Sequence, residues 1–210
     1  MRFAMPRFLL TLLGAALLSL SVSAADLPKV YRDLWYGQPR AELLKTGKFQ
    51  PNKDGTLSFR DTFAQIEVEG EIGFDDANKL VGVHLTFDPS DDADLVLAAL
   101  VKNQFIPLTL RDSQNEIDAI AFFANGGKQE SFAKAINTAI YNNDLTAVLA
   151  TGITRDPANT SAQNVAARLK PSDRIAVFTL SGEEMTVVFT NIDGLKLLMN
   201  ERNKAAADKF

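Results

Sequence analysis

Two neighbouring stretches of the chain alternate between apolar and polar residues at every second position. The first runs from residue 64 to 74, with Glu67, Glu69 and Glu71 among its polar positions, and the second runs from 81 to 87. A period of two is typical of a β-strand with one buried face, and the turn-forming segment 75–78 separates the two stretches. We therefore predict an antiparallel hairpin whose outer face stays in water. Its apolar positions are Ala64, Ile66, Val68, Ile72 and Phe74, then Val81, Val83, Leu85 and Phe87.

The rest of the chain predicts a second hairpin and several helices. Residues 174–180 and 184–190 flank the turn at 181–183 and have the composition of strands. Apolar periodicity and helix-end residues predict helices over 39–46, 89–103, 132–140 and 162–169, and from Asp193 into the alanine-rich segment 205–207.

Two further segments between the hairpins carry helix-start signals. The sequence Ser113-Gln114-Asn115-Glu116 matches a capping box and predicts a helix that continues to Ala124. Asp144 is expected to cap a short segment, 145–150, whose strand signal is weak. A hairpin followed by a helix thus occurs twice, which favours an α+β fold in which antiparallel hairpins pack against helices. We expect a single domain over 25–210, with halves 25–110 and 111–210 as an alternative division.

The N-terminus has the three parts of a secretory signal. Arg2 and Arg7 precede an apolar run from residue 8 to 20, and small residues follow it. We predict cleavage after Ala24, with an uncleaved membrane anchor as the less favoured alternative. The chain has no cysteine, so neither a disulfide nor bacterial lipid attachment at a thiol is available. A periplasmic or secreted protein, with no integral membrane span after cleavage, is the expected product.

The charge balance argues against nucleic acid as a partner. The chain holds 22 Lys and Arg against 26 Asp and Glu, a net charge of −4. Residues 1–24 contain two arginines and no acid, so the cleaved chain carries −6. A protein that grips duplex DNA needs a basic footprint to neutralise phosphates, and this composition does not supply one.

Familiar catalytic and metal sites are hard to build from this sequence. His84 is the only histidine, which excludes a His-based zinc cluster within one chain, and no Gly-x-Ser-x-Gly motif presents a nucleophile. Ser131 and Lys134 match the Ser-x-x-Lys of penicillin-recognising enzymes, but the companion motifs are misplaced. We therefore expect no cofactor, no metal and no enzymatic activity, although an enzyme that uses paired carboxylates stays an alternative.

The segment Leu34-Trp35-Tyr36-Gly37-Gln38-Pro39, with the later Phe74-Asp75-Asp76-Ala77-Asn78-Lys79-Leu80, resembles small exported modules of the β-lactamase-inhibitor-protein-like fold. The resemblance covers about residues 34–103. It implies a short helical segment paired with an antiparallel sheet, and a role in binding other proteins rather than in catalysis. No functional residue is carried over from it.

Six residues form the predicted interface. Keeping both apolar stripes of the first hairpin on one side places His84 on the outer face, opposite Glu69, Glu71 or Gly73 according to register. A His–Glu contact there, or the glutamate row itself, could meet a basic partner, and a solvated sheet face is the simpler interpretation. The aromatic residues near the mature N-terminus could anchor a partner or simply fill the sheet edge. The candidate residues are Tyr31, Trp35, Tyr36, Glu69, Glu71 and His84.

The function that fits these observations best is a non-catalytic protein-interaction module, whose partner is another protein of the cell envelope. The alternative is a periplasmic carrier that holds a small apolar or lipid ligand between helices and sheet. A cavity in the core would favour the carrier. The sequence leaves open the oligomeric state and whether the two hairpins share one sheet.

Overall fold

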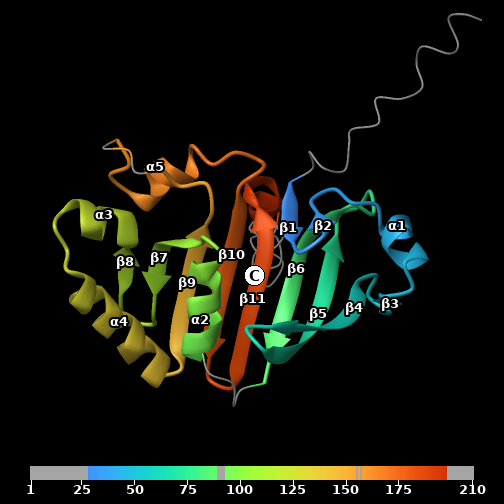
Figure 1. The fold of residues 1–210 in the computed structure, drawn as a ribbon, viewed down its shortest axis with the longest axis horizontal. Coiled ribbons are helices and arrows are strands. Elements are labelled where there is room, and N and C mark those ends of the chain that lie inside the picture. The colour runs from blue at the N-terminus through green and yellow to red at the C-terminus, as the bar shows by residue number, and fades with distance from the viewer. Residues whose placement is uncertain (1–27, 89–92, 155, 157, 198–210) are drawn as a thin grey trace, which may run out of the picture.

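A nine-stranded antiparallel sheet forms the centre of the molecule, with a small two-stranded sheet and helices packed against it (Figure 1). The predicted α+β class is confirmed. The order of strands in the large sheet is β3-β4-β5-β6-β11-β10-β9-β7-β8. The strands are β1 (Lys29–Tyr31), β2 (Leu34–Trp35), β3 (Gln50–Pro51), β4 (Leu57–Phe63), β5 (Ile66–Phe74), β6 (Leu80–Phe87), β7 (Ile106–Arg111), β8 (Glu116–Asp118), β9 (Asp144–Ala150), β10 (Arg174–Ser181) and β11 (Glu184–Asn191). The helices are α1 (Arg40–Lys45), α2 (Ala93–Lys102), α3 (Ala119–Ala124), α4 (Gln129–Tyr141) and α5 (Ala162–Ala166).

The computed structural model describes residues 28–88, 93–154, 156 and 158–197. The predicted signal segment 1–24 lies outside the described residues, as do the expected helix start at 89–92 and the alanine-rich segment 205–207. Residues 192–197 are helical, in agreement with the helix expected near Asp193.

Both predicted hairpins are present and they share one sheet. β5 pairs with β6 and β10 pairs with β11, each antiparallel, and β6 also pairs with β11. This last pairing places Val83 opposite Phe189, so strands more than 100 residues apart in sequence meet at the middle of the sheet. The sheet also continues across the 110/111 division, because β7 pairs with β9.

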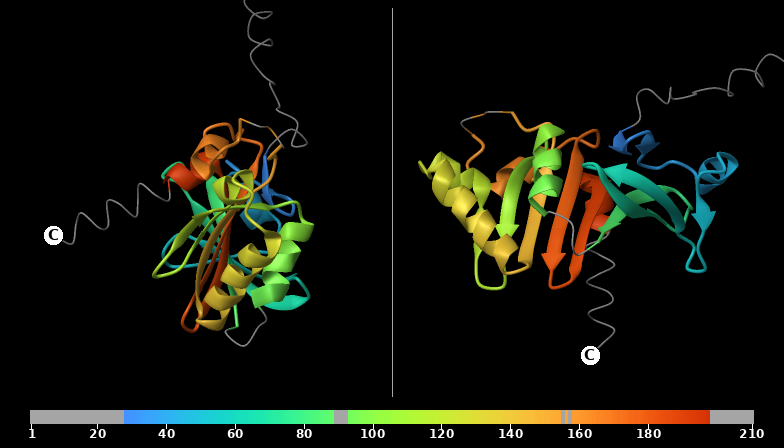
Figure 2. Two further views of the ribbon diagram at one scale, coloured as in Figure 1. Left: turned by 90° about the vertical axis from the view of Figure 1, so that its left-hand side faces the viewer. Right: turned by 60° about the horizontal axis from the view of Figure 1, so that its bottom comes forward.

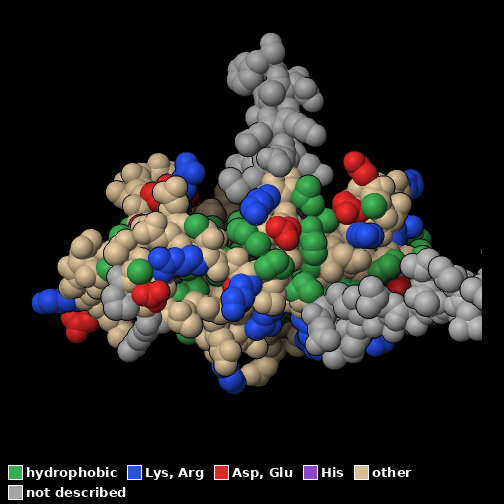
Figure 3. Space-filling view, turned by 90° about the horizontal axis from the view of Figure 1, so that it is seen from above, with side chains coloured by type: hydrophobic (Ala, Val, Ile, Leu, Met, Phe, Trp, Pro, Cys, Tyr) green, Lys and Arg blue, Asp and Glu red, His purple; other side chains and the backbone are tan. Residues whose placement is uncertain are grey.

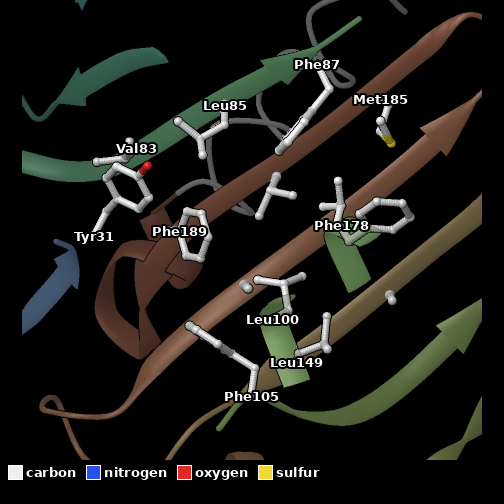
Figure 4. Packing of buried hydrophobic residues seen from close by; sticks show 14 of the residues in the cluster. Tyr31, Val83, Leu85, Phe87, Leu100, Phe105, Leu149, Phe178, Met185 and Phe189 are labelled. Atoms are coloured by element: carbon white, nitrogen blue, oxygen red, sulfur yellow. The ribbon is translucent and has the colours of Figure 1, made fainter. Parts of the chain in front are cut away.

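One face of the sheet carries the main core. The β1–β2 hairpin, α2 and α4 cover this face, which Figure 2 shows with both helices on the same side of the sheet. Phe189 lies near the centre, with its ring 5.1 Å from that of Tyr31 and 5.8 Å from that of Phe105 (Figure 4). Val96 and Leu100 of α2 are 0% exposed, as is Phe178 below them. Because an internal cavity would also expose the side chains that line it, these zeros mean that the helix is packed directly onto the sheet.

A smaller apolar cluster lies on the opposite face and at one end only. α5 contributes Ala162 and Val165, and Ile175 and Ala150 belong to the strands beneath. Half-buried Ile192 and Leu195, from the helical segment after β11, complete this cover. Over β4, β5 and β6, none of the described helices contributes to a cluster on this face, which we call the open face.

The helix predicted from Ser113 begins instead at Ala119. The Asp112 carboxylate accepts hydrogen bonds from the backbone N–H groups of Gln114 and Asn115, and this makes a turn between β7 and β8. The capping residue of α3 is Asp118, whose Oδ1 accepts from Ala121 N at 2.9 Å. The capping-box interpretation was therefore wrong, because a turn-forming side chain one residue earlier competes for the same backbone.

The segment 145–150 belongs to a strand, although its strand signal is weak. β9 runs between β10 and β7 and is covered on both faces: Leu145, Ala147 and Leu149 point into the main core, and Val148 packs against the smaller cluster. A strand buried on both faces loses the polar alternation that identifies it in a sequence. The expected cap is also corrected, since Asp144 Oδ2 accepts from Ser113 N at 2.8 Å.

Candidate functional site

The open face over β4, β5 and β6 is the candidate site. β4 and β5 are joined by a two-residue turn, Ala64-Gln65, in which both residues have positive φ angles, 53° and 69°. Such a turn matches the right-handed twist of a hairpin and fixes its register, here with Phe63 opposite Ile66. Ala64 was expected in the strand and instead forms part of the turn.

This register places the glutamates of β5 on the open face. Val68 and Ile72 are buried in the core, so the alternate residues Glu67, Glu69 and Glu71 project from the other side. The predicted solvent-facing side of the hairpin is therefore present, and it carries carboxylates at every second position of β5.

His84 lies directly opposite Glu71, one of the three registers that the sequence allowed. It is half-buried, and Val188 of β11 is its neighbour on the other side. The pair belongs to the same face as the glutamate row. A cross-strand His–Glu neighbour of this kind, open to solvent, contributes little to stability.

Two adjoining open hollows lie over this part of the sheet, with volumes of about 1010 and 630 Å³. Both border on Arg60, Glu69 and Thr86, so they meet along one row of side chains. Glu67 lines the larger hollow, and Glu71 lines the smaller one. The hollows therefore follow the glutamate row along β5.

The carboxylates of this row are only partly neutralised. Arg60 Nη2 lies 3.6 Å from Glu69 Oε1, and both side chains are well exposed. Within the described ranges neither Glu67 nor Glu71 has an ion-pair partner. The surface can accept cationic groups without first breaking a buried pair.

Tyr31, one of the candidate interface residues, lies in the core. Its side chain is 5% exposed, and burial raises the pKa of its hydroxyl to about 12, with Arg32 opposing and Asp61 adding to this shift. The hydroxyl donates to Asp61 Oδ2 at 2.7 Å. Its ring is therefore not offered to a partner, and it holds the small sheet against β4.

Trp35 and Tyr36 are half-buried and remain within reach of solvent. Tyr36 packs against the main core, and burial together with the nearby Asp193 and Asp75 raises the pKa of its hydroxyl. Figure 3 shows hydrophobic side chains gathered in the middle of the end of the molecule that is seen from above. Trp35 and Tyr36 lie in and directly after β2 of the small sheet, whereas the glutamates and His84 lie on the open face.

The structure thus separates the six predicted residues into two groups. Glu69, Glu71 and His84 come together on neighbouring strands, whereas Tyr31 and Tyr36 pack against the main core and Trp35 lies in β2 of the small sheet. Sequence reasoning missed Arg60 and Thr86, which border both hollows. Arg60 belongs to β4, whose alternating pattern is interrupted by Asp61 on the core face, so the strand itself was not predicted.

Other site chemistry was sought across the described part of the chain. No group of three or more His, Cys, Asp or Glu there could hold a metal ion. None of the helices formed by these residues is both long and apolar enough to cross a membrane.

No known protein family matches the chain, and no curated protein or solved structure is significantly similar to it. The resemblance to β-lactamase-inhibitor-protein-like modules therefore stays a prediction.

Proposed function

We propose that this protein is a non-catalytic interaction module of the periplasm or of the secreted fraction, and that it binds another protein through its open sheet face. One observation carries the proposal. The sheet is covered by α2, α4 and the β1–β2 hairpin on one side. Over β4 to β6 the other side presents a row of three glutamates along two hollows, and only Glu69 has an ion-pair partner among the described residues. A half-covered antiparallel sheet of this kind is a ready surface for protein association.

The packing of the core favours this proposal over a ligand carrier. A carrier would need room between the helices and the sheet, where Val96, Leu100 and Phe178 are each 0% exposed. Ligand sites usually enclose several hundred Å³ lined mostly by apolar groups. The hollows over the glutamates are open and border on charged side chains instead.

The carboxylates also favour a binding surface over a carboxylate enzyme. Catalytic acids are commonly buried, with a pKa raised towards neutrality. Asp54 and Asp112 have pKa values shifted downward by hydrogen bonds from neighbouring groups, chiefly Thr56 for the first and the Gln114 backbone for the second. Both act in turns, where Asp54 is exposed and Asp112 is half-buried.

The proposal is tested by photocrosslinking in the protein's own cells. A photoreactive residue replaces Thr86, which borders both hollows, and the matched control replaces Thr138 on α4, on the opposite face. We expect a discrete adduct from position 86 that is lost when Glu67, Glu69 and Glu71 are all replaced by Gln. Equal crosslinking from both positions, or none from position 86, would overturn the proposal. A small molecule released from the native protein on denaturation would support the carrier.

A further inference from the structure

The described part of the chain ends on the same side of the sheet as the glutamate row. After β11, the helical segment 192–197 packs Ile192 and Leu195 against the smaller cluster, which lies on the face opposite to the main core. Residues 198–210 follow, outside the described part of the chain. The segment 198–210 therefore starts beside the open face.

A helix that continues past Leu195 would sort the charges of this segment onto two sides. Arg202 and Lys209 come seven and fourteen residues after Leu195, about two and four turns, so they share the side of Leu195 that meets the sheet. Glu201 and Asp208 come six and thirteen residues after it, and they fall on the other side. The side towards the sheet thus carries Arg202 and Lys209 and neither acid.

The glutamate row offers the complementary charge. Glu69 pairs with Arg60 at 3.6 Å, whereas neither Glu67 nor Glu71 has an ion-pair partner among the residues that the structure describes. Four residues of strand separate these two carboxylates by about 14 Å. Seven residues of helix separate the two cations of segment 198–210 by about 10 Å. The spacings are close enough for both long basic side chains to reach the row.

The segment is also long enough to cover this part of the sheet. From Asn191 to the level of Thr86 the sheet extends five residues along β11, or about 17 Å, and β5 lies two strands, about 10 Å, to the side. A helix over residues 192–210 is about 28 Å long. Between its start and the glutamates lie His84 and Val188, which are neighbours and both half-buried.

We infer that residues 198–210 fold back as a helix onto the open face, with Arg202 and Lys209 towards the glutamates of β5. The segment then occupies the surface that we assign to a partner protein, so the partner must displace it. Exposed ion pairs contribute little each, and the attachment is therefore weak enough for a stronger competitor to replace. This regulatory role rests on the proposed function, whereas the docking itself does not.

A photoreactive residue in place of Thr86 tests the docking and the proposed function with one variant. Thr86 borders both hollows, so it lies where the docked segment passes. In the purified chain from residue 25 onward, we expect a product with the mass of one chain in which position 86 is joined to segment 198–210, as mapped by mass spectrometry of its peptides. The same photoreactive residue at Thr138 on α4, on the opposite face, should not give this product.

Two lysine reversals separate docking from chance encounter. Lys209→Glu places an acid against the glutamates, and we expect about a threefold or greater loss of the intrachain product. Lys204→Glu changes the net charge equally, but this residue comes nine residues after Leu195, about two and a half turns, and so lies on the outer side of the helix. It should leave the product unchanged. In the protein's own cells, Lys209→Glu should raise the yield of the partner adduct from position 86, and Lys204→Glu should not.

The docking is overturned if position 86 gives no link to segment 198–210. It is also overturned if the two lysine variants, shown by circular dichroism to be folded, lower the link equally. Failure of the docking is distinguishable from failure of the proposed function. A partner adduct without the intrachain product removes the docked segment and keeps the interaction module, whereas an intrachain product without any adduct, even in Lys209→Glu, keeps the docked segment and removes the partner.

Discussion

The Tyr31 hydroxyl donates a hydrogen bond to Asp61 Oδ2 across 2.7 Å, and so joins the small sheet to β4 of the large one. Arg32 forms an ion pair with the same carboxylate oxygen at 2.6 Å, and its Nη2 donates to the Thr62 carbonyl. Two residues from β1 and the turn after it thus satisfy an aspartate that β4 carries on its core face. The N-terminal hairpin is part of the structural unit because of this contact.

Removal of the Tyr31 hydroxyl should change the response of the protein to alkali. The folded-state pKa is raised to about 12, above the ordinary value of 10.0, so folding favours the protonated phenol. This contribution to stability is fully present below pH 10 and is lost as pH rises towards 12. A two-unit shift corresponds to at most about 2–3 kcal/mol.

We expect Tyr31→Phe to flatten the loss of stability between pH 10 and 12 in urea unfolding curves. Tyr141→Phe is the matched control, because that ring is 88% exposed. A steep alkaline loss that persists unchanged in Tyr31→Phe would contradict the assignment.

Gly70 should not tolerate a side chain, because the Phe59 ring lies across it. A Cβ atom at position 70 would come within 2.2 Å of Phe59 Cζ. We expect Gly70→Ala to lower the free energy of unfolding by about 1–3 kcal/mol, since the ring must leave its place. Gly73→Ala, in the same strand, meets Val81 Cγ2 at 3.8 Å, an ordinary contact, and should cost much less. Equal losses in thermal unfolding for the two variants would refute this account.

Asp118 should stabilise two helices at once. Its Oδ1 accepts from Ala121 N in α3, and its Oδ2 accepts from Ala162 N at 2.8 Å, at the start of α5. Since one helix cap is worth about 1 kcal/mol, Asp118→Ala should cost about 2 kcal/mol in urea unfolding. Ser161→Ala removes only one cap contact, to Asn164 N at 3.2 Å, and serves as the reference. A loss no greater than that of Ser161→Ala would show that the second contact adds nothing.

The two faces of α2 should respond differently to the same substitution. Leu100 is fully buried against the sheet, and Leu95, one and a half turns away, is 52% exposed. Leu100→Ala should lower the free energy of unfolding by about 2–5 kcal/mol through lost contacts and a cavity. Leu95→Ala should change it by about 0.5 kcal/mol or less. Similar losses for both, measured by calorimetry, would mean that α2 is covered on its outer side.

Local pattern was enough to predict the two hairpins, because each has one apolar and one polar face. It was not enough for β4. Asp61 interrupts the apolar face of that strand, and the groups that compensate it lie 30 residues earlier in the chain, at Tyr31. The contact between Tyr31 and Asp61 can be recognised only after the fold has brought these two segments together.

The candidate site was predictable only within one hairpin. The alternation of β5 and β6 predicted that His84 shares a face with the glutamates, whereas the register that sets it opposite Glu71 is specified by the folded sheet. The pairing of β6 with β11, which sets Val188 beside His84, belongs to the order β6-β11-β10-β9, and no local sequence signal specifies that order.

The strands that complete the sheet come last in chain order among the strands that the structure describes. β10 and β11 span Arg174–Asn191 of a 210-residue chain, and they lie between β6 on one side and β9 on the other. A nascent or truncated chain that ends before residue 174 therefore holds two partial sheets that cannot meet, with β6 and β9 as unpaired edges. Such edges recruit strands from other chains. We therefore expect a chain that lacks its C-terminal hairpin to aggregate more readily than the full chain.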